Sequence, residues 1–297
     1  MRIFVTGASG FIGSAVVQEL ISAGHQVLGL ARSDASAKAL AAEGAEVHRG
    51  SLEDVESLRR GAEACDGIIH TAFIHDFSQY KASCEVDRGA IDALGSALAG
   101  STRPLVVTSG TLIISPGSMA TETTVVARTS EAAPRLASEE AADALVKRGI
   151  NASVVRLSPS VHGDGDHGFV PALIDIARTK GVSAYVGDGN NRWPAVHRFD
   201  AARLFRLAVE KSTPGARYHG VGEEGIPVRE IAAVIGKHLN VPVVSKSAQE
   251  AGDHFGWLSY FLSADCPASS KQTQQQLGWT PTHVGMLKDL DVGTYFK

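Results

Sequence analysis

The sequence is poor in cysteine. Only three occur among 297 residues, Cys65, Cys84 and Cys266, and no two of them form a C-x-x-C pair. Their wide spacing excludes a disulfide-stapled scaffold and the paired-cysteine metal motifs. It predicts free, mostly buried thiols and a protein of the reducing cytoplasm.

Long apolar runs and an excess of one charge are also lacking. No apolar run approaches the ~18 residues that a transmembrane helix requires, and Met1 leads almost at once into a strand-like segment, without the pattern of a secretory signal. The net charge of −4 gives no reason to expect binding to nucleic acid or to an anionic membrane. With 44% apolar and 20% charged residues the composition is typical of a soluble globular protein.

The most informative segment lies near the N-terminus. Residues 6–13 read Thr-Gly-Ala-Ser-Gly-Phe-Ile-Gly, directly after the apolar run Ile3-Phe4-Val5, and an amphipathic stretch closed by Gly24 follows. A buried strand, a glycine turn and a helix start form a cradle for phosphate, because glycines let the backbone approach a pyrophosphate and the helix N-terminus offers free N–H donors. We therefore expect a dinucleotide site here, rather than a turn that merely joins strand to helix.

Strand-like and helix-like stretches alternate to about residue 160. Strands are predicted at 2–6, 26–30, 45–48, 67–71, 104–108 and 152–157, and helices at 35–43, 53–62, 85–99 and 136–148. This alternation predicts an α/β fold with a doubly wound parallel sheet. Residues 161–200 look like site-forming loops around a helix at 170–179, and further helices are predicted at 201–211, 227–239 and within 269–279. We expect a dinucleotide-binding domain over 1–160, to which some later segments return, and a smaller, mainly substrate-binding lobe over 161–297.

The spacing of Gly7, Gly10 and Gly13 resembles the T-G-x-x-G-x-x-G fingerprint of the extended short-chain dehydrogenase/reductase family, and the resemblance covers nearly the whole chain. It implies a Rossmann-type domain that binds NAD(P), with a C-terminal lobe over the substrate. Thr71 and Ala72, which it places beside the ribose, have ordinary strand-end packing as their alternative. The cofactor-binding residues expected are Thr6, Gly7, Ser9, Gly10, Phe11, Ile12, Gly13, Arg32, Ser33, Ser51, Leu52, Thr71, Ala72, Phe73, Pro159 and Val161.

The end of the second strand favours NADP(H) over NAD(H). In the usual dinucleotide fold an acidic residue here binds the ribose 2′-hydroxyl, but Ala31 stands at that position, followed by Arg32 and Ser33. A guanidinium and a hydroxyl suit a 2′-phosphate through charge-assisted hydrogen bonds. Two alternatives stay open: Arg32 as a solvated loop cation, and Asp34 as a ribose ligand.

The family's usual chemistry, as the resemblance implies, uses a Tyr, a Lys four residues later, and a Ser or Thr after the fifth strand. The hydroxyl residues after the fifth strand are present. Ser109 and Thr111 are candidates to hold a substrate oxygen, with capping of a turn as the alternative. No Tyr-x-x-x-Lys lies between this strand and the next. The chain therefore resembles the atypical, extended-like members of the superfamily.

Two polar residues stand where the Tyr and the Lys are expected. Counted back from Arg156, the Tyr position falls near Glu131 and the Lys position near Arg135, with Glu139 four residues later. Arg135 could hold the ribose or a substrate carboxylate, but it is a poor acid because its pKa exceeds ~12. Glu131 could donate a proton only if burial raised its pKa. The alternative for both is a solvated helix start.

Two histidines are candidate general acids. His75 follows the fourth strand, and His162 lies in a loop where the family often carries Tyr-Gly. An imidazole titrates near neutral pH and suits this role, although a loop histidine bonded to backbone is the alternative. Residues 162–167 also look like a metal-binding loop, but the resemblance to the family's G-x-G loop is the simpler explanation, and we expect no metal.

Residues 186–200 resemble a family segment that lines the substrate cleft. Tyr185 and Trp193 are candidate apolar walls, Arg192 is a candidate for binding an anionic group, and Asp200 is expected to be a helix N-cap. Four late residues either close the pocket or pack in the core: His254, Phe255, Trp257 and Tyr260.

These features predict an NADP(H)-dependent oxidoreductase that reduces a small carbonyl or imine compound. Hydride leaves the nicotinamide, Ser109 or Thr111 holds the polar atom, and His162, His75 or bound water supplies the proton. The alternatives are a nucleotide-sugar epimerase or dehydratase and a non-catalytic NADP-binding sensor. A homodimer through the helices at 85–99 and 136–148 is expected by resemblance only.

Overall fold

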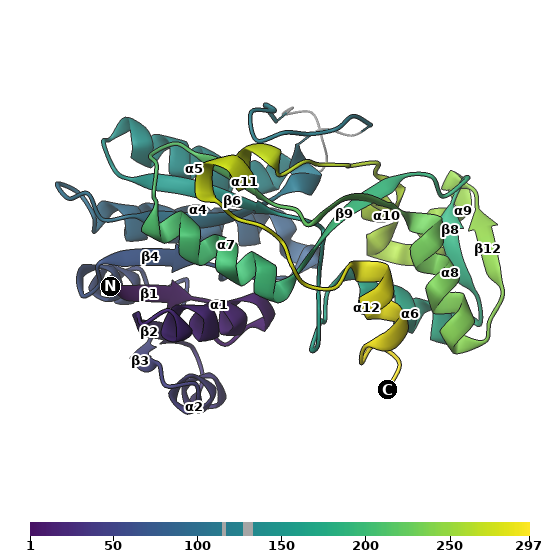
Figure 1. The fold of residues 1–297 in the computed structure, drawn as a ribbon, viewed down its shortest axis with the longest axis horizontal. Helices are drawn as coiled ribbons and strands as arrows, with labels where there is room; N and C mark the ends of the chain where they lie inside the picture. The colour runs from purple at the N-terminus through teal and green to yellow at the C-terminus, as the bar shows by residue number, and fades with distance from the viewer. Residues whose placement is uncertain (115–116, 127–132) are drawn as a thin grey trace.

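The computed structural model of the protein describes residues 1–114, 117–126 and 133–297. They form a larger lobe, which contains the N-terminus, and a smaller lobe beside it (Figure 1). In the described ranges no helix is both long enough and apolar enough to cross a membrane.

A seven-stranded sheet forms the centre of the larger lobe, in the order β10-β6-β5-β4-β1-β2-β3. All six strand pairs are parallel, which confirms the predicted doubly wound sheet. The strands are β1 (Arg2–Thr6), β2 (Gln26–Ala31), β3 (Glu46–Arg49), β4 (Gly67–His70), β5 (Leu105–Gly110), β6 (Ala152–Leu157) and β10 (Arg217–Gly220). Strand order reverses between β1 and β4, which is where such sheets bind ligands at the carboxyl ends of their strands.

Helices cover both faces of this sheet because successive side chains of a strand point to opposite sides. Ile3 and Val5 pack with α1 (Phe11–Ser22) and α7 (Arg198–Glu210), whereas Phe4 packs with the helices of the other face. Those helices are α3 (Val55–Glu63), α4 (Tyr80–Ser96) and α5 (Leu136–Lys147); α2 (Asp34–Ala42) lies beside β2 and β3, and three-residue helices lie at η1 (Phe77–Gln79), η2 (Thr111–Ile113) and η3 (Ala133–Arg135).

The smaller lobe and its connection are built from later segments. A three-stranded sheet, β11-β9-β7, joins the lobes, and the pair β12-β8 lies in the smaller lobe. Its elements are β7 (Ser160–His162), α6 (Phe169–Lys180), β8 (Ser183–Val186), β9 (Arg192–His197), β11 (Glu223–Pro227), α8 (Val228–Leu239), β12 (Val243–Lys246), α9 (Ala248–Phe255), η4 (Gly256–Leu258), α10 (Ser259–Ser263) and α12 (Met286–Val292). Within the range 161–297, α7, β10 and α11 (Lys271–Leu277) pack on the larger lobe.

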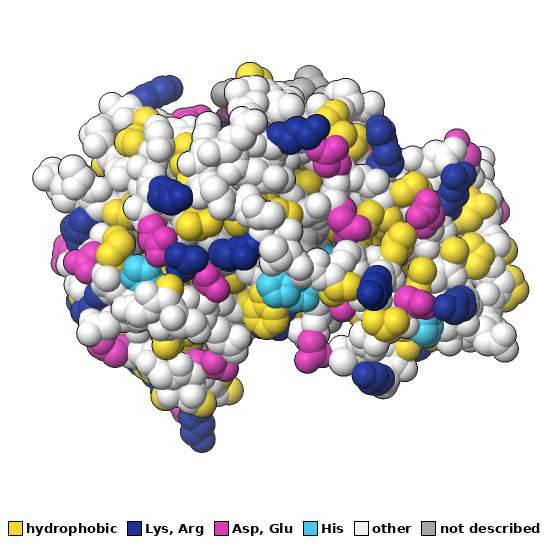
Figure 2. Space-filling model, viewed as in Figure 1, with side chains coloured by type: hydrophobic (Ala, Val, Ile, Leu, Met, Phe, Trp, Pro, Cys, Tyr) yellow, Lys and Arg dark blue, Asp and Glu magenta, His cyan; other side chains and the backbone are white. Residues whose placement is uncertain are grey.

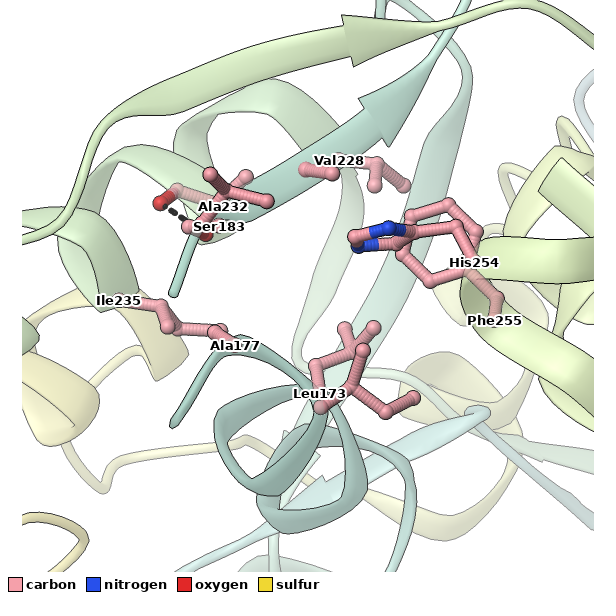
Figure 3. Close-up of a pocket in the computed structure, with 11 residues that line it drawn as sticks. Leu173, Ala177, Ser183, Val228, Ala232, Ile235, His254 and Phe255 are labelled. Carbon is pink, nitrogen blue, oxygen red and sulfur yellow. Dashed lines mark hydrogen bonds between the residues drawn. The ribbon is translucent and has the colours of Figure 1, made fainter. Parts of the chain in front are cut away.

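The core of the smaller lobe contains one small cavity of about 10 Å³, space for roughly one water molecule. It lies between α6, β8, α8 and α9, and its wall is apolar apart from Ser183 and His254. The imidazole of His254 faces the cavity (Figure 3), and its buried Nε2 has no hydrogen-bond partner among the described residues. Burial lowers the pKa of His254, which favours the neutral ring.

Two expectations need correction. The helix predicted to begin at Asp200 begins at Arg198, and its N-cap is His197, whose Nδ1 accepts from Phe199 N at 3.3 Å. Asp200 is buried in the first turn, where its carboxylate accepts the backbone N–H groups of Thr282 and His283. The N-cap interpretation was therefore wrong: Asp200 fastens the C-terminal segment instead. The helix predicted at 85–99 begins five residues earlier, at Tyr80.

The three cysteines are free and buried, as predicted. Burial raises the pKa of the Cys65 and Cys84 thiols to about 11. All three are thus packing residues in the protonated form at neutral pH.

Candidate active site

The glycine turn between β1 and α1 is built so that only glycine fits. Gly7 has a φ of +66°, and a Cβ there would lie 2.7 Å from the backbone N of Ala72. A Cβ on Gly13 would overlap the carbonyl oxygen of Gly7, which accepts the N–H of Gly10 at 2.9 Å. The backbone is therefore bare on this side, as close approach of a pyrophosphate requires.

Helix α1 starts at this turn with no side-chain cap. Its N-cap is Gly10, and no side chain accepts from the first turn. The amides of Phe11, Ile12 and Gly13 have no acceptor within the helix, because the first intrahelical bond runs from Ser14 N to the Gly10 carbonyl, so they can donate to an anion at the positive end of the helix dipole. Ser9 is exposed on the same turn. These residues fit a dinucleotide pyrophosphate.

Two arginines lie at the carboxyl ends of β2 and β3, Arg32 directly after β2 and Arg49 as the last residue of β3. Arg32 is exposed and has no ion-pair or hydrogen-bond partner among the residues that the structure describes. Arg49 pairs with Ala31 in the sheet register and binds the carboxylate of Asp34 at 2.5 Å. Ser33 caps α2 by accepting from Ser36 N at 3.2 Å. Asp34 is thus bound by Arg49, a residue that sequence reasoning missed because the two lie 15 residues apart, at the start of α2 and at the end of β3.

The remaining cofactor candidates are placed around this edge. The Ser51 hydroxyl accepts from Glu53 N at 3.3 Å, and Leu52 packs partly buried against the helices of one sheet face. The Thr71 hydroxyl donates to the Thr6 carbonyl at 2.7 Å, which ties the end of β4 to the glycine turn. Pro159 and Val161 lie after β6, and Val161 packs against the core of the larger lobe.

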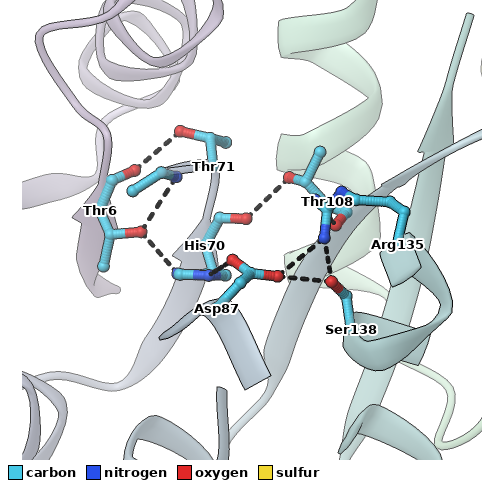
Figure 4. A network of polar contacts seen from close by, with 8 residues as sticks. Thr6, His70, Thr71, Asp87, Thr108, Arg135 and Ser138 are labelled. Carbon is cyan, nitrogen blue, oxygen red and sulfur yellow. Dashed lines mark hydrogen bonds and ion pairs between the residues drawn. The ribbon is translucent and has the colours of Figure 1, made fainter. Parts of the chain in front are cut away.

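A buried polar chain runs from the glycine turn to the start of α5 (Figure 4). Thr6 Oγ1 and His70 Nδ1 are 2.8 Å apart, and His70 Nε2 is 2.9 Å from Asp87 Oδ1. Because a carboxylate only accepts, Nε2 of His70 carries a proton and donates it to Asp87. The other oxygen of Asp87 accepts from Arg135 at 2.8 Å and from Ser138.

Asp87 is an ionised carboxylate inside the protein. Its side chain is 1% exposed. Burial alone would raise its pKa, but the hydrogen bond from His70 and the charge of Arg135 hold that pKa at about 2. The carboxylate is therefore charged at neutral pH and pairs permanently with Arg135.

Arg135 is held in place from several sides. Besides Asp87, its guanidinium donates to the Thr108 carbonyl at 3.0 Å and contacts the Ser138 hydroxyl. Its Cζ lies 4.3 Å above the ring centroid of Phe73, a cation–π contact at the end of β4. The cation predicted at the Lys position thus lies between the ends of β4 and β5. Glu131, the residue predicted at the Tyr position, lies outside the described residues.

The end of β5 presents two buried hydroxyls. Those of Ser109 and Thr111 have no hydrogen-bond partner in the described ranges. The Ser109 hydroxyl lies near the carboxylate of Glu139 without a hydrogen bond of good geometry. Glu139 binds Arg156 through two contacts of 2.8 Å. Buried hydroxyls without partners are costly, so each of these two could donate to a further acceptor.

The two candidate histidines have different surroundings. His75 follows β4 and contacts the edge of Phe73 at 5.2 Å between centroids. Burial, and after it the charge of Arg135, lowers the pKa of His75, so its ring is neutral at neutral pH. His162 is buried, its Nδ1 lies 2.8 Å from Asp289, and its ring faces His197 at 5.3 Å. The structure therefore brings His75, but not His162, together with Arg135.

The loop after β7 closes on the glycine turn. Arg198 reaches the Asp164 carbonyl at 2.7 Å and the Ser14 hydroxyl at 2.9 Å, and lies 4.7 Å above the ring of Phe11. The Tyr295 hydroxyl donates to Asp166 at 2.9 Å. The C-terminal segment thus fastens the loop that carries the two acidic residues. In the described part of the chain, no group of three or more His, Cys, Asp or Glu is arranged to hold a metal ion.

The predicted substrate residues belong to the smaller lobe and to the joining sheet. Arg192 is already paired with Asp265 through contacts of 3.0 and 2.9 Å. Trp193 is fully buried, and its Nε1 donates to the Phe261 carbonyl at 3.2 Å. Tyr185 is partly buried on β8. The structure thus shows these side chains as packing and pairing residues within the lobe.

A bare glycine turn before an uncapped helix, at the switch point of a parallel sheet, is the arrangement of a dinucleotide-binding protein. A comparison with protein families agrees with this interpretation and names the family. The model of the NAD dependent epimerase/dehydratase family matches residues 3–219. The chain belongs to this family, which confirms the resemblance to the extended short-chain dehydrogenases/reductases.

Individual relatives agree with this assignment. The uncharacterized protein C2A9.02 of Schizosaccharomyces pombe is 53% identical over 297 residues, 100% of both chains. The 2-alkyl-3-oxoalkanoate reductase of Stenotrophomonas maltophilia is 29% identical over 261 residues, 83% of this chain and 78% of the relative. The dTDP-glucose 4,6-dehydratase DesIV of Streptomyces venezuelae, solved with NAD and TYD bound, has a TM-score of 0.78 at 21% identity over 98% and 95% of the two chains, a likeness of fold.

Proposed function

We propose that the chain is an NADP(H)-dependent oxidoreductase that reduces a small carbonyl or imine substrate. The observation that carries the proposal is that Arg135, fixed by a buried carboxylate, lies beside the end of β5, where the hydroxyls of Ser109 and Thr111 have no hydrogen-bond partner of good geometry in the described ranges. This pairs a cation for the ribose with donors for a substrate oxygen, at the strand ends where the nicotinamide half of a dinucleotide would lie.

The cofactor preference rests on the charge at the end of β2. The guanidinium of Arg32 has no partner within the described residues, and Arg49 neutralises the carboxylate of Asp34. A 2′-phosphate gains two cations at this place, whereas a ribose 2′-hydroxyl loses its usual carboxylate acceptor to Arg49. This arrangement supports NADP(H) rather than NAD(H).

In the proposed reduction, Ser109, Thr111 and Arg135 have different roles. When bound, reduced nicotinamide would supply the hydride for the carbonyl carbon. Ser109 and Thr111 donate hydrogen bonds to the substrate oxygen, and these strengthen as negative charge develops on it. Arg135 keeps spare N–H donors beyond those bonded to Asp87 and Thr108, and these hold the nicotinamide ribose. The name of the Stenotrophomonas relative, an oxoalkanoate reductase, also favours ketone reduction.

The test is NADPH consumption by the purified chain against a panel of aldehydes, ketones, 3-oxoalkanoates and cyclic imines, with NADH in parallel. Turnover that prefers NADPH is expected for one class, and Ser109→Ala should lower kcat there. Turnover of nucleotide sugars without net cofactor consumption would overturn the proposal in favour of an epimerase or dehydratase. Tight NADPH binding with no turnover of either kind, together with cofactor-dependent binding of a partner, would favour a sensor.

A further inference from the structure

A reductase of this kind needs a proton donor, and the tyrosines of the chain can be examined in full. The sequence has five, and all lie in the described ranges. Tyr218 is buried on β10, Tyr295 donates to Asp166, and Tyr185 lies on β8 of the smaller lobe. Only Tyr80 and Tyr260 remain as candidates near the fixed cation.

Helix α4 places Tyr80 at the reactive edge. Tyr80 is the first residue of α4, which follows β4, so it lies at the carboxyl ends of the strands. Cys84 and Asp87 follow at four and seven residues, a spacing that puts all three on one helix face. Asp87 on that face binds Arg135 at 2.8 Å. Tyr80 therefore lies about two turns from the anchor of Arg135, on the side where a cofactor enters.

The side chain of Phe73 contacts both Tyr80 and Arg135. Its ring centroid is 6.3 Å from that of Tyr80, at an interplanar angle of 69°. The Cζ of Arg135 lies 4.3 Å from the same centroid. Burial raises the pKa of Tyr80 to about 12, while the charge of Arg135 acts in the opposite direction. The phenol is protonated at neutral pH, and a cation stands close enough to stabilise the phenolate.

We propose that Tyr80 is the proton donor, and that Tyr80 and Arg135 replace the missing Tyr-x-x-x-Lys pair from two different helices. The inference rests on the proposed reductase function. Hydride from reduced nicotinamide forms the new C–H bond, and the C=O π pair moves onto oxygen. The O–H bond of Tyr80 breaks as the new alcohol O–H forms. The phenolate left beside Arg135 then regains a proton from solvent.

The neighbours of Tyr80 are compatible with this step. Its hydroxyl interacts with the thiol of Cys84, which is a weak acceptor. A carbonyl oxygen is the stronger acceptor and would draw the hydroxyl away. Tyr260, in contrast, packs against the cluster of Ile113 and Leu136 from α10, a separate element of the smaller lobe. It is the rival donor, and the experiment must separate the two.

The experiment compares Tyr80→Phe, Tyr260→Phe and Tyr218→Phe. Tyr218 serves as the matched control, a buried tyrosine of the larger lobe. With a ketone substrate, Tyr80→Phe should lower kcat by about 100-fold or more, the usual scale of general acid catalysis, and leave the Kd for NADPH unchanged. With a cyclic iminium that arrives already protonated, Tyr80→Phe should keep near wild-type turnover. A loss in Tyr260→Phe with Tyr80→Phe intact, or equal losses on ketone and iminium, would overturn the assignment.

A second measurement does not depend on turnover. In protein labelled at tyrosine Cζ, the Tyr80 resonance is assigned by its disappearance in Tyr80→Phe. It should shift on addition of NADP⁺ and in Arg135→Gln, while the Tyr218 resonance stays in place. If neither change moves it, Tyr80 does not adjoin the cofactor and Arg135, and the proposal fails even if the chain is a reductase. If it shifts but no carbonyl is reduced, the proposed function fails and the pairing stands.

Discussion

Asp87 accepts a 2.8 Å hydrogen bond from Arg135, and both side chains are largely withdrawn from solvent, at 1% and 13% exposure. The carboxylate lies on α4 and the guanidinium at the start of α5, so this ion pair links the two helices at the candidate site. Desolvated partners of this kind depend on each other, because either one left alone is a buried unpaired charge.

The first prediction follows from this dependence. Asp87→Ala should lower the free energy of unfolding by about 3 kcal/mol or more, because it leaves Arg135 and the proton of His70 without their acceptor. Urea denaturation monitored by circular dichroism measures the change. The matched control is Asp92→Ala on the same helix, where the pair with Arg148 is 59% and 48% exposed. That variant should cost less than about 1 kcal/mol. Equal effects in the two variants would contradict the structural role given to Asp87.

The second prediction concerns the glycine turn. Gly13→Ala puts a methyl group into the carbonyl oxygen of Gly7 and forces the turn open. The Kd for NADPH, measured by fluorescence titration, should rise by more than about 10-fold, or about 1.4 kcal/mol. Gly89→Ala is the control, because its site on α4 is open and exposed. There the helix should gain about 0.5–1 kcal/mol of stability, with cofactor binding unchanged. Tight NADPH binding by Gly13→Ala would show that the pyrophosphate does not occupy this turn.

The third prediction tests the 2′-phosphate site. Arg32→Ala should weaken NADPH by about 10- to 100-fold, the value of a charge-assisted hydrogen bond, and leave NADH nearly unchanged. Isothermal titration with both cofactors gives the comparison. Arg59→Ala is the control, since Arg59 is another exposed arginine and pairs with Glu56 within its own helix. Equal losses for NADPH and NADH in Arg32→Ala would remove the assignment.

A fourth prediction separates Arg49 from Arg32. Arg49→Ala frees the carboxylate of Asp34, which then repels a 2′-phosphate and can accept from a 2′-hydroxyl. The ratio of NADH to NADPH affinity should therefore rise, by about 10-fold or more if both effects contribute. The double variant Arg49→Ala with Asp34→Asn should return part of the preference for NADPH. An unchanged ratio in Arg49→Ala would mean that the ion pair lies outside the cofactor site.

The segment expected to bind the cofactor could be predicted from the sequence, because the residues that form it are close together in the chain. A strand, the turn at Gly7, Gly10 and Gly13, and a helix start follow one another within a short segment, and the structure has them in that order. The position of Arg135 was also predictable, by counting from Arg156. Its function was not, since that depends on Asp87, whose contact with Arg135 spans 48 residues.

The reactive end was harder to predict for physical reasons. The helix start at Tyr80 was missed because the apolar spacing becomes regular only farther along α4, and with it the tyrosine that faces Phe73. The joining sheet β11-β9-β7 was missed because β7 has only three residues and the pairing of β11 with β9 has a register shift between Glu223 and Ile226. The role of Asp200 was missed because its partners, Thr282 and His283, lie on a segment that returns from the end of the chain.

The last prediction is a loss of stability in mild acid. Burial, together with the neighbouring His162 and His283, lowers the pKa of His197 to about 4. An unfolded histidine binds its proton near pH ~6.5. Between these values the unfolded chain holds more protons than the folded one, so stability is present above pH ~6.5 and falls as the pH drops toward 4. Buried His219, with a pKa of about 4, acts in the same direction.

The variant His197→Asn tests the contribution of one ring. Asparagine is a good N-cap, so the start of α7, which His197 now caps through Phe199 N, should be kept. At neutral pH the variant should remain close to wild type in stability. Between pH ~6.5 and 4 its loss of stability should be smaller by about 1 kcal/mol, with the remainder due to His219 and other titrating groups. Thermal unfolding across this pH range gives the slope, and a slope equal to that of wild type would show that the stacked imidazoles of His197 and His283, 4.6 Å apart, do not resist protonation.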